Sequence, residues 1–246
     1  MRNSTAAKQL NEKFSLKTEH MILEQVALNA GLPKKTITTT INKVCASGMK
    51  SIMFASQHIM ANPGDVLIAG GMESMSNVPY YMKRESPPYG GVQLIDGLLK
   101  DGLTDAYDPI HMGVCGEHTS KKLSITRKHQ DEFATLSYQR AIKAADSGVL
   151  QREITPITIK GKRGKPDTVM NEDEEIRRVA FEKLASLPTV FDKANGTITA
   201  ANASKLSDGA AACLLMSEKM VRELNVEPLA VIEGFADGYG IEFRIF

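Results

Sequence analysis

Hydrophobic residues recur at helical spacing in three stretches of the 246-residue chain. The first covers residues 20–30, the second follows Cys45 and ends at residues 62–64 (NPG), and the third follows Thr126 and ends at Gly148. Apolar side chains three and four positions apart share one face of a helix. Proline and glycine end such runs, and threonine is a residue type that caps the start of a helix. We therefore predict three helices.

Strand patterns fall between and after these helices. Residues 35–42 (KTITTTIN) are rich in β-branched side chains, and residues 65–69 form a short apolar run before a Gly-Gly pair that predicts a tight turn. Residues 154–159 alternate like a strand, and residues 214–216 predict a return to a buried strand or helix. Strand, helix and strand in this order form a βαβ unit, which predicts a parallel sheet in an α/β core. Residues 76–108 are rich in proline and glycine, and we expect loops there.

Composition and charge narrow the class of protein. Hydrophobic residues make up 42% of the chain and charged residues 24%, which is typical of a globular protein. The 30 basic and 29 acidic residues nearly balance, so neither nucleic acid nor an anionic membrane is expected as the main partner. No apolar run approaches the ~20 residues of a membrane span. Three cysteines in a chain of this length favour a reducing compartment over a disulfide framework.

Cys45 is the first candidate for chemistry. It lies where the β-branched run meets the second predicted helix, followed by Ala46, Ser47 and Gly48. Unpaired backbone N–H groups and the helix dipole at such a position favour the thiolate, which is the nucleophilic form. The small neighbours leave room for a thioester to approach. By burial habits alone, however, a small buried packing residue is the more common role of a cysteine.

Longer motifs around Cys45 resemble the thiolase family. The matching blocks follow in order as residues 44–49 (VCASGM), 69–76 (AGGMESMS), 100–105 (KDGLTD) with 111–113 (HMG), 195–204 (NGTITAANAS) and 207–211 (SDGAA). The resemblance extends from about residue 24 to about residue 236, and in its details it is nearest to the mitochondrial acetoacetyl-CoA type.

The resemblance implies an α/β thiolase-like fold, with an amino-terminal core half and a loop domain but without the second core half. It implies the following segments: an unmatched segment at 1–23, a partial core at 24–76 and 205–230, a loop domain on the coenzyme A (CoA) side at 77–204, and a divergent tail at 231–246.

The resemblance also implies roles for individual residues. Cys45 would carry the acyl group, with His111 and Met112 beside it. The positions that match CoA contacts are Tyr138, Arg178, Lys183 and Ser204, and Phe191 matches an aromatic residue of the pantetheine tunnel. The positions that match a potassium site of the mitochondrial type are Tyr138, Ala200, Ala201 and Ala203. Ala180 departs from the family, which usually has Asp there. Without the resemblance, His111 would be a surface residue, and Arg177, Arg178 and Lys183 would be a solvated basic face.

The family's other catalytic motifs do not occur in the printed sequence. These are a G-H-P turn whose His activates the cysteine, a C-x-G turn that moves a proton, and an N-E-A-F turn that helps to stabilise the oxyanion. We expect acetyl transfer between CoA thioesters through a Cys45 thioester, with little turnover by this chain alone, because general acid–base help contributes on the order of 10²–10⁴-fold. The alternatives are a non-catalytic thiolase-like subunit that binds a full-length thiolase or CoA, and a condensing enzyme of the ketoacyl-synthase kind.

The expected partners and location follow from the same resemblance. It implies acetyl-CoA and acetoacetyl-CoA as substrates and a homotetramer as the assembly, with no nucleic acid and no membrane. It implies a mitochondrial location, although the first 20 residues have one Arg and two acids and therefore make a poor transit peptide. The cytoplasm is the alternative.

Overall fold

The computed structural model describes residues 22–161 and 164–238, which belong to two compact units. One unit contains residues 22–77 and 207–238, and carries Cys45. The other contains residues 78–161 and 164–206, and carries the predicted CoA side. We call them the cysteine unit and the CoA-side unit, and each is described by itself.

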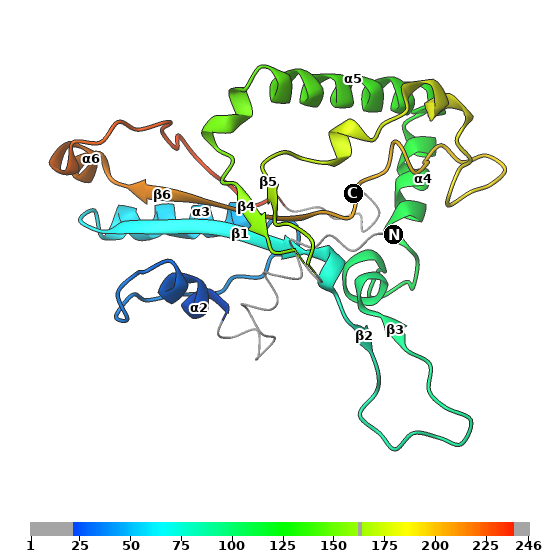
Figure 1. The fold of residues 1–246 in the computed structure, drawn as a ribbon, viewed down its shortest axis with the longest axis horizontal. Coiled ribbons are helices and arrows are strands. Elements are labelled where there is room, and N and C mark those ends of the chain that lie inside the picture. The colour runs from blue at the N-terminus through cyan, green and yellow to red at the C-terminus, as the bar shows by residue number, and fades with distance from the viewer. Residues whose placement is uncertain (1–21, 162–163, 239–246) are drawn as a thin grey trace. The chain divides into compact units, whose positions relative to one another are not determined.

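A pair of long strands and one helix build the cysteine unit. Strands β1 (Val66–Ser74) and β6 (Asp208–Met216) pair antiparallel over their full length. Helix α3 (Ser47–Ala61) runs along them, as Figure 1 shows. The remaining elements are α2 (Ile22–Asn29), the short helical turn η2 (Met75–Asn77) and α6 (Glu218–Leu224). The predicted helix before residue 30 and the helix after Cys45 are thus confirmed.

Small residues let α3 lie close to β1. Ala55 of the helix forms a buried cluster with Ala69 and Leu215 of the two strands. A Cβ atom added at Gly71 would lie 3.1 Å from the Cα atom of Gly48, so a side chain at Gly71 would crowd the backbone of the helix. Helix and strand therefore meet through glycine backbones at the end of α3 that follows Cys45.

Three strand predictions are corrected in this unit. Residues 35–42 form no strand: their side chains are mostly exposed, Ile37 to 93%, and β-branched residues favour a strand only where a pleated surface is half-buried. Gly70 and Gly71 do not make a tight turn, because β1 continues through them to Ser74. The sheet is antiparallel rather than parallel, because the partner of β1 is the distant β6 and not a preceding strand. For residues 214–216 the sequence predicted a strand or a helix, and the structure shows that they belong to strand β6.

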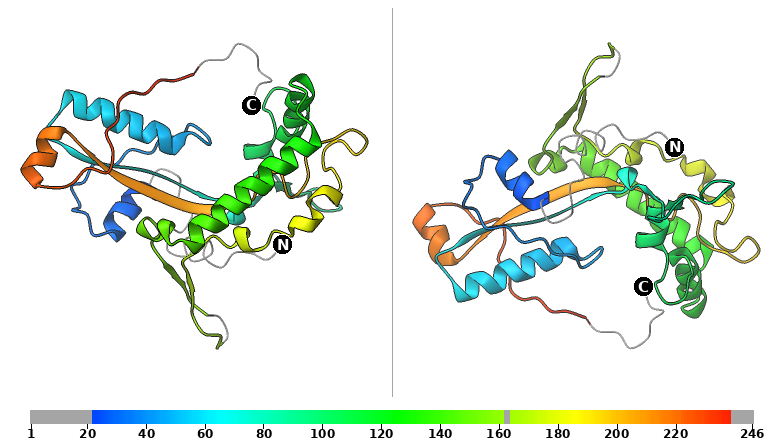
Figure 2. Two further views of the ribbon diagram at one scale, coloured as in Figure 1. Left: turned by 90° about the horizontal axis from the view of Figure 1, so that it is seen from above. Right: turned by 90° about the horizontal axis from the view of Figure 1, so that it is seen from below.

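The CoA-side unit is built around two helices. Its elements are β2 (Tyr80–Tyr81), β3 (Ile95–Asp96), the helical segment η3 (Leu98–Leu103), α4 (Met112–Lys122), α5 (Arg127–Asp146), η4 (Val149–Arg152), β4 (Ile157–Ile159), β5 (Thr168–Met170), η5 (Glu175–Arg177) and η6 (Phe181–Ser186). Strands β2 and β3 form one antiparallel pair, and β4 and β5 another. Figure 2 shows η6, in yellow, beside the long helix α5.

Helix α5 confirms the third predicted helix and its cap. The Thr126 hydroxyl accepts a hydrogen bond from the His129 N–H at 3.2 Å, which satisfies a donor that the first turn leaves unpaired. Gly148 follows the helix with φ of 73°, a left-handed conformation that glycine adopts without steric cost. Over the described part of the chain, none of the helices is long and apolar enough to cross a membrane.

Candidate functional site

Cys45 lies in a tight turn immediately before α3, with its thiol free and exposed. The Asn42 side-chain carbonyl accepts from the Val44 N–H at 3.0 Å. The Ser47 hydroxyl accepts from the Lys43 N–H at 2.8 Å and donates to the Val44 carbonyl at 2.7 Å. The role of a small buried packing residue is therefore wrong for Cys45, because local hydrogen bonds present it at the surface.

The residue before the thiol has an unusual backbone conformation. Val44 has φ of 49°, and a β-branched residue rarely takes a positive φ because its side chain crowds the backbone. Such strain costs on the order of 1–3 kcal/mol and is retained where the surroundings over-determine it, which is common at functional sites. The hydrogen bonds of Asn42 and Ser47 supply that support. Hydrogen bonds within the turn thus stabilise the strained conformation of Val44.

A carboxylate lies beside two lysines that flank this turn. The Asp237 carboxylate is 2.5 Å from the Lys50 Nζ and 3.8 Å from the Lys43 Nζ. The Lys50 ammonium also lies 4.8 Å above the Phe54 ring, and its side chain is only 15% exposed. The hydrogen bond from Lys50 is the main cause that lowers the pKa of Asp237 below its usual value of 3.8. The sequence reasoning did not identify Asp237, which lies far along the chain.

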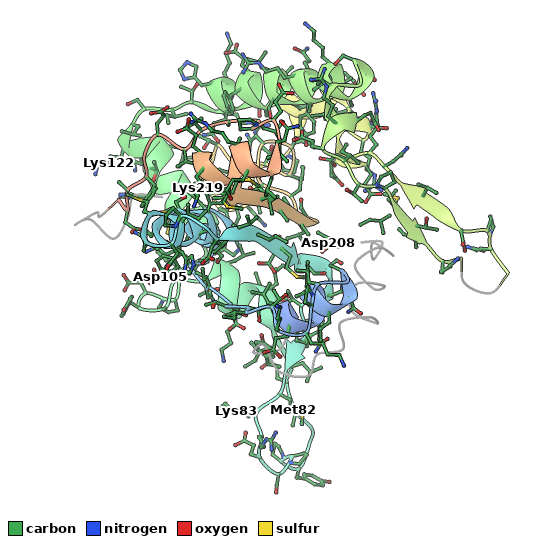
Figure 3. The ribbon with its side chains drawn as sticks, turned by 90° about the vertical axis from the view of Figure 1, so that its left-hand side faces the viewer. Met82, Lys83, Asp105, Lys122, Asp208 and Lys219 are labelled. Atoms are coloured by element: carbon green, nitrogen blue, oxygen red, sulfur yellow. The ribbon has the colours of Figure 1, made fainter. Side chains whose placement is uncertain are left out.

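Two of the family-like motifs meet across the strand pair. Ser74 lies opposite Asp208 and Ala69 opposite Cys213, so residues 69–74 pair with residues 208–213, which include most of the block at residues 207–211. The Asp208 carboxylate accepts from the Ser76 N–H at 3.0 Å and from the Ser76 hydroxyl at 2.6 Å. Asp208, labelled in Figure 3, thereby fixes the chain where it leaves β1. Both motifs belong to one structural feature of the cysteine unit.

In the CoA-side unit, the structure brings His111 and Phe191 together. His111 caps α4, and its Nδ1 accepts from the Gly113 N–H at 2.9 Å. Its ring stacks on the Phe191 ring with 4.8 Å between the centroids. A Cβ atom at Gly113 would lie 2.1 Å from the Phe191 ring, which explains why this motif needs glycine. Met112, the first residue of α4, is exposed.

Glu117 holds the start of the loop at residues 195–204. Its carboxylate accepts from the Thr197 N–H at 2.9 Å, from the Thr197 hydroxyl at 2.8 Å and from the Ile198 N–H at 2.8 Å. Hydrogen bonds to a charged acceptor are roughly twice as strong as neutral ones. The sequence reasoning did not identify Glu117, since its partners lie about 80 residues away.

Asn202 holds the middle of the same loop. Its amide nitrogen donates to the Asp131 carboxylate at 3.0 Å and to the Thr197 carbonyl at 2.9 Å, and its amide oxygen accepts from the Thr199 N–H at 2.8 Å. Thr199 itself is fully buried. Asn202 was part of a quoted motif without an assigned role, and its role in the structure is to tie the loop to α5.

The carbonyls predicted for potassium lie on this loop. The Thr199 hydroxyl accepts from the Ala201 N–H at 3.3 Å, and the Thr199 carbonyl accepts from the Ala203 N–H at 3.0 Å. The Ala200 carbonyl accepts from the ammonium group of Lys205. The Ala200 carbonyl is thus occupied by a side-chain ammonium group, and backbone carbonyl oxygens are a ligand type that suits a potassium ion. Elsewhere in the described residues, no group of three or more His, Cys, Asp or Glu side chains could hold a metal ion.

The other predicted CoA positions are spread over α5, η5 and η6. Tyr138 packs edge-to-face on Phe181, with 6.4 Å between the ring centroids. Lys183 lies in the same segment η6, for which Ala180 is the preceding residue. Ser204 is exposed at the end of the loop at residues 195–204.

Arg178 already has anionic partners in the chain. Its guanidinium is 2.8 Å from the Glu174 carboxylate and 3.0 Å from the Glu175 carboxylate. Its neighbour Arg177 bonds Asp146 and Glu172, and these hydrogen bonds raise the pKa of Arg177. A phosphate that binds Arg178 must therefore compete with two exposed carboxylates.

A cavity of about 590 Å³ lies between α5 and η6. Leu136, Phe181, Leu184 and Ala185 form its apolar part, and charged and polar residues of α5 line the rest. None of the predicted CoA residues lines this cavity, although Phe181 is also the ring on which Tyr138 packs. The predicted positions and the cavity are thus neighbours and not one site.

Comparison with known proteins identifies the class to which this fold and these motifs belong. Residues 12–219 match the family described as Thiolase, N-terminal domain, and the chain therefore belongs to the thiolase family. It is 60% identical over 213 residues to the mitochondrial acetyl-CoA acetyltransferase of Mus musculus and 58% identical to that of Homo sapiens. These matches cover 87% of the chain and 50% of each relative, so the chain spans about half the length of these relatives.

Solved structures agree with this assignment. The Acat5 thiolase from Ascaris suum in complex with coenzyme A superposes with a TM-score of 0.77 at 40% identity, and covers 89% of this chain and 55% of that one. The human mitochondrial 3-ketoacyl-CoA thiolase superposes with a TM-score of 0.77 at 36% identity, over 85% and 53%. The resemblance drawn from the motifs is confirmed, and the chain has the thiolase fold over about half of those structures.

Proposed function

We propose that this chain carries the acyl-accepting half of an acetyl-CoA C-acetyltransferase. The Cys45 thiolate attacks the carbonyl carbon of acetyl-CoA, the carbon–sulfur bond to CoA breaks, and CoA leaves as its thiol after taking a proton. Cys45 then holds an acetyl thioester. A second acetyl-CoA loses a proton from its methyl carbon and attacks the thioester carbonyl, so that a carbon–carbon bond forms, the bond to the Cys45 sulfur breaks, and acetoacetyl-CoA leaves with the Cys45 thiolate restored. In the cleavage direction, the CoA thiolate attacks the acetyl thioester and leaves as acetyl-CoA. The observation that carries the proposal is the exposed thiol in a hydrogen-bonded turn at the start of α3.

The CoA side of the proposal uses the second unit. His111, Met112 and Phe191 would line the acyl and pantetheine end, and the stacked rings of His111 and Phe191 offer an apolar wall there. The residues that would hold the rest of CoA are Tyr138, Arg178, Lys183 and Ser204. Since Glu174 and Glu175 already pair with Arg178, we expect its contribution to CoA affinity to be small.

A potassium ion at Tyr138 and at the carbonyls of Ala200, Ala201 and Ala203 is part of the proposal. When bound, the ion would add a fixed positive charge that draws these oxygens together. Thr199 and Asn202 would keep the loop in the conformation that presents them.

The test of the nucleophile separates acylation from turnover. The purified chain is incubated with acetyl-CoA, and intact-mass spectrometry follows the addition of one acetyl group, with Cys45→Ala as the variant and Cys213→Ala as the exposed-cysteine control. We expect acetylation of the wild type and of the control but not of Cys45→Ala. Acetylation of all three proteins to the same extent would overturn the role of Cys45.

Turnover is expected to be negligible for the 246 residues alone. The printed sequence holds none of the G-H-P, C-x-G and N-E-A-F motifs. Without a base, a second proton carrier and an oxyanion donor, a loss of several orders of magnitude in rate is expected. Cleavage of acetoacetyl-CoA by the purified chain measures this, and robust Cys45-dependent cleavage would contradict it.

A non-catalytic role as a subunit that joins a full-length thiolase has support from one face of the cysteine unit. Ile68 and Leu214 lie opposite each other on the strand face that α3 does not cover, and they are 58% and 59% exposed. Apolar side chains in such a position favour association. Co-purification with an intact thiolase and a loss of its activity with increasing amounts of this chain would support this role.

Location and assembly complete the proposal. The relatives at 58% and 60% identity are mitochondrial by name, and we propose the same compartment for this chain. We also propose a homotetramer, the assembly that the family resemblance implies. Native mass spectrometry and fractionation of cells test the two statements separately.

A further inference from the structure

We propose that Lys205 is a built-in competitor of potassium, whose ammonium group occupies the Ala200 carbonyl and weakens potassium binding at the loop of residues 195–204. The inference rests on the proposed potassium site. It concerns a residue of this chain that the resemblance does not assign. The observation behind it is the hydrogen bond from the Lys205 ammonium to the Ala200 carbonyl.

The Lys205 ammonium group and a potassium ion both bind to carbonyl oxygens of the loop. Each carries a single positive charge and is satisfied by carbonyl oxygens, and Lys supplies three donors without any acceptor. An oxygen that accepts from Lys205 presents its lone pair to that group and has less to offer to an ion. Two like charges at one carbonyl also repel each other at short range. Potassium must therefore displace the Lys205 ammonium before it binds the Ala200 oxygen.

The loop is held firmly enough for this competition to be a local one. The Thr199 hydroxyl and carbonyl accept from the N–H groups of Ala201, Asn202 and Ala203, so the backbone around Ala200 is bonded from within. Lys205 follows Ala200 by five residues, and its side chain folds back onto the same loop. Removal of the ammonium group therefore frees the Ala200 oxygen while the other hydrogen bonds of the loop remain.

The experiment compares potassium binding with and without the ammonium group. The variant is Lys205→Met, which keeps a flexible stem of similar length and removes the charge, and Lys193→Met is the control for the loss of an exposed lysine in the preceding turn. The Tm of each protein is followed as KCl replaces choline chloride at constant ionic strength. Binding of thallium(I), a potassium substitute, is measured in parallel by thallium NMR.

We expect Lys205→Met to bind potassium roughly tenfold more tightly than the wild type, a difference of about 1.4 kcal/mol, because the ion no longer has to displace the ammonium group. Its Tm should rise at lower KCl concentrations, whereas Lys193→Met should follow the wild type. Circular dichroism reports whether Lys205→Met folds. If it folds poorly, Lys205→Gln takes its place, and we expect the same increase in potassium affinity from it.

Two results would overturn the inference, and they differ in what else they remove. An equal potassium response in the wild type and in both Lys205 variants would leave the potassium site standing without competition from Lys205. A lack of response to potassium and thallium in all proteins would remove both the competition and the site. Acetylation of Cys45, measured as described above, tests the proposed acyl transfer independently of either result.

Discussion

The two units hold their functional segments by different means. In the cysteine unit, the turn before α3 rests on glycine backbones that touch β1 and on a few hydrogen bonds within residues 42–47. In the CoA-side unit, the loop at residues 195–204 is tied by side chains of α4 and α5, with Glu117 alone accepting from two N–H groups and a hydroxyl. Glycine packing and hydrogen bonds between near neighbours in sequence thus place the nucleophile, whereas side chains from distant helices place the CoA-side loop.

The two regions also differ in how far contacts within their own unit satisfy them. Hydrogen bonds between described residues satisfy the loop at residues 195–204 within its own unit. The strand pair of the cysteine unit, by contrast, has an apolar face on which Ile68 and Leu214 remain exposed. We therefore expect the CoA-side loop to depend less than the strand pair on contacts outside its own unit.

The largest effect is expected at Gly70 of β1, where an added side chain would meet the paired strand. A Cβ atom at Gly70 would lie 2.6 Å from the Ala211 carbonyl oxygen, so Gly70→Val forces the two strands apart. We expect a loss of about 3 kcal/mol or more in the free energy of unfolding, since overpacking and strand disruption both contribute. Gly64→Ala is the control, because a Cβ atom there has no neighbour within 4 Å. Urea denaturation measures both, and equal midpoints would contradict the glycine packing.

A smaller effect is expected from the polar network of the CoA-side unit. Glu117→Ala leaves the N–H groups of Thr197 and Ile198 without their acceptor, and we expect a loss of about 2 kcal/mol in the free energy of unfolding. Glu132→Ala is the control, because Glu132 is exposed and its carboxylate lies 3.7 Å from the Lys128 ammonium group. A surface ion pair of this kind contributes about 0–1 kcal/mol. Faster amide exchange at residues 197–202 should accompany Glu117→Ala. An unchanged exchange pattern would show that the loop does not depend on Glu117.

The smallest effect is expected from the ion pair at the cysteine turn, and it depends on pH. The pKa of Asp237 lies below its usual value of 3.8, chiefly because Lys50 donates a hydrogen bond to it. The ionised carboxylate therefore stabilises the folded chain at a pH above the usual pKa of an Asp side chain. This contribution is lost as the pH falls through the lowered pKa. The difference in free energy of unfolding between wild type and Asp237→Asn should be constant near neutral pH and vanish in acid. A difference that does not change with pH would contradict a role for the charge.

Local features of the chain were predictable from its sequence. Apolar spacing, the Thr126 cap and the left-handed Gly148 concern residues within a few positions of one another, and the helices they predict are present as α2, α3 and α5. The motifs around Cys45 also identified the thiolase family, which the comparisons confirm.

Contacts between distant segments could not be predicted from the sequence. Residues 35–42 have the composition of a strand but no neighbouring surface to pack on, and Gly70 and Gly71 belong to a strand because Ala212 and Ala211 lie opposite them. Glu117 and Asp237 have their partners about 80 and 187 residues away, at a separation where sequence spacing carries no geometric information. The sequence alone was enough to predict α2, α3, α5, the Thr126 cap and the nucleophile's motif, because these depend on neighbours along the chain, whereas α4 and α6 were not predicted. Strand pairing and the hydrogen bonds of Glu117 and Asp237 depend on neighbours in space, because their partners are far apart along the chain.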